Sequence, residues 1–139
     1  MDFVSLYLQL FSVPFGWFAL RADLRAFRLP NSTTYPMLIL GTINVLDSIS
    51  FNELAIRLAS VLPLSVVGAG MGDVKLLSAL VLLTHGLLPS LVILPVASLV
   101  ALGVAGVKYR KRMRIPFGPY LICVSWAVWC FEIVSQMLP

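Results

Sequence analysis

Charged residues are scarce in this chain of 139 residues, because Asp, Glu, Lys and Arg together make up only 12% of it. A soluble domain of this size carries roughly a quarter of its residues as these four types. Hydrophobic residues make up 60%, and the mean hydropathy is +0.97. This composition excludes a soluble globule and predicts an integral membrane protein. No polar stretch is long enough to hold a second domain, so we expect residues 1–139 to form a single membrane-embedded domain.

Cysteine is almost missing, with Cys123 and Cys130 as its two occurrences. On a helix they would lie about 10 Å apart, too far for a disulfide. We expect both to be small apolar packing residues. There is no C-x-x-C pair and a single histidine, so no structural zinc site is predicted. We therefore expect no metal, no cofactor and no nucleic-acid partner.

Long apolar runs are what the chain has instead. They cover residues 3–20, 35–50, 54–68, 74–88, 89–107 and 118–137. Several are shorter than the ~20 residues that cross a bilayer comfortably. The first run has no basic n-region and no small-residue cleavage site, so it reads as a retained span. The predicted fold is an all-α polytopic membrane protein with about six transmembrane helices.

The basic residues fix the orientation of these helices. Nine of the ten follow the first, third and fifth runs, namely Arg21, Arg25, Arg28, Lys75, Lys108, Arg110, Lys111, Arg112 and Arg114. That side is therefore predicted to be cytoplasmic, and both termini to be external. Arg57 is the exception, and it follows Glu53 by four residues, the favoured order for an ion pair on a helix.

On the predicted cytoplasmic side only two acidic residues remain, Asp23 and Asp73. They belong to different helices at the same membrane depth, so they could meet. Paired carboxylates share one proton and can activate water without a metal. Taken singly, Asp73 could be only a helix N-cap, and Asp23 only a partner of nearby arginines. The residues alone therefore favour an aspartyl hydrolase without excluding a structural role.

The glycines of GAGMGD, at 68, 70 and 72, directly precede this carboxylate. Glycine allows unusual backbone angles and close approach of another segment. Asp73 would begin the fourth helix, where the helix dipole favours its ionised form. Lys75 points to a different face of that helix, and we expect it to contact lipid headgroups or to position a substrate.

Three stretches occur in order: DLRAFRLPN (23–31), GAGMGDVKLL (68–77) and RIPFGPYL (114–121). With them the chain resembles the type IV prepilin peptidases, which are GxGD aspartyl proteases. The resemblance implies that Asp23 and Asp73 are catalytic. It also implies a prepilin or pseudopilin substrate, whose short basic leader is cut off at the cytoplasmic face of the bacterial inner membrane, usually after a glycine. Leu29 stands where the family often has isoleucine, a chemically neutral difference.

The resemblance extends to the short, peptidase-only form that serves tight-adherence (Flp-type) pili. Larger members carry a cytoplasmic domain with C-x-x-C pairs and also methylate the new N-terminus, an activity we do not expect here. The turn formed by Pro116, Phe117, Gly118 and Pro119 is either a rigid entry to the last helix or a lining of the cleft that contacts the substrate. The leader and the cytoplasmic face are both basic, so we expect anionic lipids to attract both.

Two other functions are compatible with the composition. A small proton- or ion-coupled transporter would place carboxylates nearer the middle of the bilayer. A non-catalytic subunit of a pilus or secretion assembly would tolerate Asp-to-Asn changes. Neither accounts for the three ordered motifs. Glu132, near the external end of the last run, is expected to snorkel to the outer interface or to be hydrogen-bonded there, rather than to be a functional acid.

Overall fold

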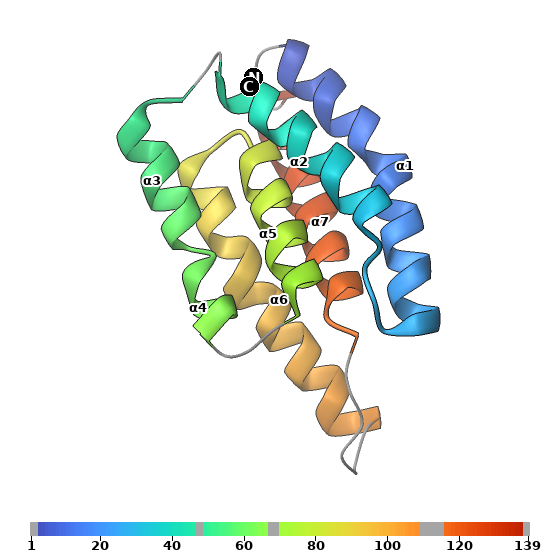
Figure 1. Ribbon diagram of the computed structural model, residues 1–139. Helices are drawn as coiled ribbons and strands as arrows, with labels where there is room; N and C mark the ends of the chain where they lie inside the picture. The colour runs from blue at the N-terminus through green and yellow to red at the C-terminus, as the bar shows by residue number, and fades with distance from the viewer. Residues whose placement is uncertain (1–2, 47–48, 67–69, 109–115, 138–139) are drawn as a thin grey trace.

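The computed structural model describes residues 3–46, 49–66, 70–108 and 116–137, and every regular element in these ranges is an α-helix. The helices are α1 (Phe3–Ala26), α2 (Asn31–Leu46), α3 (Phe51–Ala59), α4 (Leu62–Val66), α5 (Met71–Leu83), α6 (Leu87–Lys108) and α7 (Gly118–Met137). They form one bundle in which α1, α3 and α6 run opposite to α2, α5 and α7, and the start of α1 and the end of α7 lie at the same end of the bundle (Figure 1). The predicted all-α fold class is confirmed.

The helix boundaries differ from the predicted runs, most clearly in the second and third runs. α2 begins at Asn31, earlier than expected, because Thr33 and Thr34 donate backbone hydrogen bonds to Pro30 O and start the helix in the polar segment. The third run is not one helix but two, α3 and α4. α3 ends where the Ser60 hydroxyl donates to Arg57 O, and α4 starts just before Pro63, a residue suited to the first turn of a helix.

Two of the described helices are long and apolar enough to cross a membrane by composition. They contain Leu87–Val104 of α6 and Gly118–Ser135 of α7, with mean hydropathies of 2.4 and 1.4. The other predicted spans are shorter or more polar, so the number of crossings stays a prediction. Cys123 and Cys130 are exposed on α7, which corrects the expectation that they pack inside.

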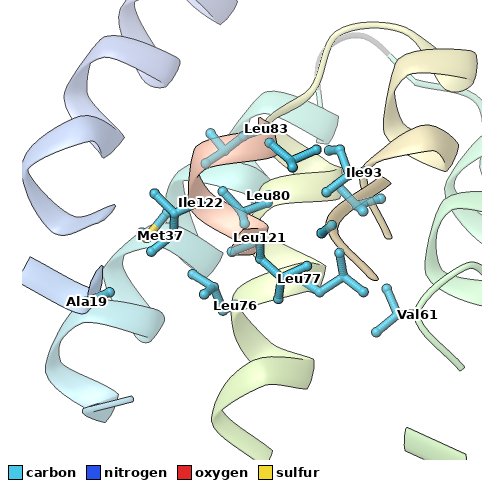
Figure 2. Packing of buried hydrophobic residues seen from close by; sticks show 14 of the residues in the cluster. Ala19, Met37, Val61, Leu76, Leu77, Leu80, Leu83, Ile93, Leu121 and Ile122 are labelled. Atoms are coloured by element: carbon cyan, nitrogen blue, oxygen red, sulfur yellow. The ribbon is translucent and has the colours of Figure 1, made fainter. Parts of the chain in front are cut away.

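Helix α5 is the centre of the bundle and contacts every other helix. Its residues from Leu76 to Leu83, apart from Ser78, are buried. Around them lie Met37 of α2, Ile93 of α6, and Leu121 and Ile122 of α7 (Figure 2). A helix that is apolar on all sides is stable only inside a protein or a membrane. The core therefore fixes the position of α5, the helix that carries Asp73.

A network of polar side chains from other helices surrounds the C-terminal end of α5. Thirteen residues give a length of about 20 Å, less than the ~30 Å hydrocarbon core of a bilayer. Backbone carbonyls at such an end need donors from the protein. The donors come from three helices: Gln9 to Leu83 O, Asn44 to Leu82 O, and Arg57 to Val81 O, Thr84 O and His85 O.

Arg57 is fully buried, and its guanidinium also lies 2.6 Å from Glu53, which confirms the predicted ion pair. This explains why Arg57 does not follow the distribution of the other basic residues: it binds the carbonyls at the end of α5 and does not face a membrane surface. Of the two positions expected for Glu132, the structure shows the hydrogen-bonded one, since the residue is buried. Its carboxylate accepts from Gly86 N–H at 3.1 Å, in the turn between α5 and α6.

Replacing Arg57 with methionine should lower the free energy of unfolding by about 3 kcal/mol or more. The change leaves buried carbonyls without a donor and Glu53 without its partner. Thermal unfolding of the purified protein in detergent measures the effect. Arg21→Met, on the exposed side of α1, is the matched control and should change stability by about 0.5 kcal/mol or less. Equal effects of the two substitutions would contradict a capping role for Arg57.

Candidate active site

Asp23 lies in the last turn of α1 and is only 4% exposed. The helix ends at Ala26, and Phe27 follows with a positive φ of 51°. The Phe27 N–H donates to Asp23 O at 2.9 Å. This bond is typical of an α-helix that ends in one residue of left-handed conformation. This conformation costs a non-glycine residue about 1 kcal/mol or more. The turn directs the chain across the end of the bundle to Pro30 and the start of α2.

Asp73 is the third residue of α5, and its N–H bonds to Gly70 O at 2.9 Å. Its side chain is half-buried. The end of α1, the start of α5 and the start of α7 lie at the same end of the bundle (Figure 1). The helix ends that carry Asp23 and Asp73 therefore lie at the same end of the bundle, while their depth in a membrane stays a prediction.

The two carboxyls interact electrostatically, and both lie outside the apolar runs predicted to cross the membrane. Burial raises the pKa of Asp73, and the charge of Asp23 raises this pKa further, to about 6. Burial also raises the pKa of Asp23, while the hydrogen bond from Gly118 lowers it. The start of a helix favours an ionised Asp73, but burial and the neighbouring carboxylate outweigh that effect.

Gly118 connects the third motif to Asp23. It is the first residue of α7, and its N–H donates to Asp23 Oδ2 at 3.1 Å. A Cβ at this position would lie 2.9 Å from the same oxygen, so any other residue would displace the Asp23 carboxylate. Pro116 and Pro119 are buried on either side, and Phe117 is half-buried. The turn therefore does more than start a helix, since it brings a backbone donor to the carboxylate.

Of the two described glycines before Asp73, Gly72 makes a close approach to another segment. A Cβ at Gly72 would lie 2.8 Å from the Cβ of Leu29. Gly70 has an ordinary φ of −60°, and a Cβ there would come no nearer than 3.6 Å to Asp73 Oδ2. Gly68 lies outside the described residues. The expected close approach of another segment is therefore found at Gly72, whereas Gly70 has room for a side chain.

Lys75 contacts side chains of α2. Its Nζ lies 3.2 Å from Asn31 Oδ1 and 3.1 Å from the Tyr35 hydroxyl, with the Tyr35 ring 4.6 Å away. These contacts join α5 to α2, two residues after Asp73. The lysine is thus engaged within the protein. No group of three or more His, Cys, Asp or Glu that could hold a metal ion is found in the described part of the chain.

Comparison with known proteins assigns the chain to a family. The family model described as the type IV leader peptidase family matches residues 10–107, more than half of the chain. The chain belongs to the type IV leader peptidase family. The matched range contains both aspartates and the GxGD motif, while the Pro-Phe-Gly-Pro turn lies beyond it. No curated protein and no solved structure matches the chain.

Membership of the leader peptidase family makes the chain a peptidase of a generally aspartic type. Together with the two long apolar helices, it also indicates a membrane protein. Sequence reasoning did not find every residue around this peptidase's two aspartates. It took Leu29 as neutral, because a leucine in an apolar chain carries no signal. It also did not find that Asn31 and Tyr35 would bind Lys75.

Gly72→Ala and Gly118→Ala should each impair cleavage by this leader peptidase and cost about 1–3 kcal/mol of stability, because the new methyl group meets Leu29 or Asp23. Gly70→Ala is the matched control and should be tolerated, since its methyl group meets ordinary contacts. The three variants are compared by thermal unfolding and by cleavage of a leader-bearing substrate in membranes. Loss of activity in Gly70→Ala but not in the other two variants would contradict the conclusion that Gly72 and Gly118 are the closely packed positions.

The stability of the protein should depend on pH through Asp73. Its folded-state pKa of about 6 lies above the ordinary value of 3.8. A raised carboxyl pKa gives a stabilising contribution that is complete below the unfolded pKa and is lost as the pH rises through 6. Asp73→Asn should therefore unfold a few degrees higher than wild type at pH 7.5. At pH 4 the two should unfold together, and a gap that persists there would contradict this origin.

Proposed function

We propose that this leader peptidase is a membrane aspartyl endopeptidase whose dyad is Asp23 and Asp73. The observation that carries the proposal is the electrostatic interaction of these two carboxyls. They come from different helices and belong to a chain of the type IV leader peptidase family. An isolated helix cap would need neither a second carboxylate nor the Gly118 N–H directed at it.

In the proposed mechanism the two carboxyls divide the work of acid and base. The Gly118 N–H stabilises the ionised form of Asp23, so Asp23 takes the proton from the attacking water. Asp73, with a raised pKa of about 6, carries the shared proton and polarises the carbonyl of the scissile bond. The apparent pKa values in a pH–rate profile then belong to the pair rather than to either residue.

The proposed substrate is a prepilin of the Flp type or a pseudopilin. Its short basic leader would be removed at the cytoplasmic face of the bacterial inner membrane by a peptidase with about six crossings and external termini. The proposal is limited to peptidase activity. Anionic lipids are the proposed surface on which enzyme and leader meet. Arg21 and Arg25 line a shallow groove with Phe18 and Ala22 on the outside of α1, next to the dyad's end of the bundle, and would bind the lipid phosphates.

Co-expression with an Flp-type prepilin in bacterial membranes tests the proposal. Wild type should shift the mobility of the prepilin, and Asp23→Asn and Asp73→Asn should each abolish the shift while still accumulating. Asp47→Asn, at an aspartate predicted to lie on the opposite side, is the matched control and should cleave normally. A shift that survives either dyad substitution would overturn the aspartyl mechanism and favour a non-catalytic role for the pair.

A further inference from the structure

Leu29 occupies the space between the three segments that form the proposed active site. A Cβ at Gly72, in the first turn of α5, would lie 2.8 Å from the Leu29 Cβ. A Cβ at Gly118, the first residue of α7, would lie 3.2 and 3.3 Å from the two Leu29 methyl groups and 2.9 Å from Asp23 Oδ2. The leucine side chain therefore packs against both glycines, directly beside the carboxylate.

The backbone holds Leu29 in this place from both sides. Before it, the left-handed Phe27 closes α1 through its bond to Asp23 O. After it, Pro30 has a fixed φ, and its carbonyl accepts hydrogen bonds from the start of α2, including one from the Thr33 hydroxyl at 2.9 Å. The loop is anchored at each end to a helix. Leu29 is thus a fixed wall of the site.

We propose that Leu29 determines specificity by limiting the size of the substrate residue beside the cleaved bond. This inference rests on the function proposed above. For water activated by the dyad to attack, the scissile carbonyl must come within hydrogen-bonding reach of the carboxyls. A side chain on a residue next to the scissile bond then contacts Leu29. Because Leu29 packs closely against both glycines, it cannot move aside. One extra methyl group in such a site is rejected by about 10–200-fold.

The test uses prepilin substrates that differ at one residue beside the cleaved bond. Glycine, alanine and valine are placed first before the bond and then after it, and kcat/KM is measured for each with purified enzyme in lipid vesicles. At one of the two positions, wild type should prefer glycine over valine by at least about tenfold. Leu29→Ala should raise the valine-to-glycine ratio by about tenfold or more. This ratio does not respond to a general loss of stability or of active enzyme.

Three control variants accompany Leu29→Ala. Leu29→Ile keeps the volume of the side chain and should keep the wild-type ratio. Leu24→Ala makes the same deletion at an exposed position of the same motif and should also keep it. Leu29→Val makes a smaller deletion and should shift the ratio in the same direction by a smaller factor. It decides the question if Leu29→Ala does not accumulate.

The outcomes separate the two proposals. If wild type cleaves the glycine substrate but the ratio is unchanged in Leu29→Ala and Leu29→Val at both positions, the role of Leu29 is overturned and the peptidase function stands. If Leu24→Ala relaxes the ratio as much as Leu29→Ala, the role of Leu29 is also overturned. If wild type cleaves none of the substrates, the proposed function fails, and this inference fails with it.

Discussion

The fold depends on satisfying the backbone carbonyls at the C-terminal end of α5. This helix is the most buried element and is about 20 Å long, so its last carbonyls lie among apolar neighbours rather than in water. Gln9, Asn44 and Arg57 donate to them from three other helices. An unpaired carbonyl there would cost about 1–3 kcal/mol. The donors therefore fix the position of α5 along its own axis, and with it the level of Asp73 at the opposite end.

At that opposite end, close packing replaces hydrogen bonding as the constraint. Gly72 and Gly118 lack side chains where Leu29 and Asp23 need room. The three motifs meet there because a short loop, the start of α5 and the start of α7 share one end of the bundle (Figure 1). The site thus combines one polar contact, from Gly118 N–H to Asp23, with a tightly filled apolar wall. Such an arrangement buries both carboxyls enough to raise their pKa values.

Sequence reasoning is strongest where a residue type is rare in its surroundings. It selected Asp23 and Asp73 because acids are nearly absent from the predicted cytoplasmic side, and it predicted the ion pair of Glu53 and Arg57, which the structure confirms, from their spacing on a helix. It failed where the surroundings offer no contrast. Leu29 is one of many leucines, and the exposure of Cys123 and Cys130 on α7 could not be read from an apolar segment. The break between α3 and α4 was missed because apolar composition alone does not mark a helix end.

The sequence by itself determined the all-α fold class and the family, and it singled out Asp23 and Asp73. Hydropathy, charge asymmetry and motif spacing are local properties that the chain carries before it folds. Only the tertiary structure decided which glycines are needed, where Lys75 and Arg57 bind, and that burial outweighs the helix dipole at Asp73. These outcomes depend on distances between segments far apart in the chain, such as Leu29 to Gly118 and Arg57 to Thr84. Such distances are fixed only when the helices pack around α5.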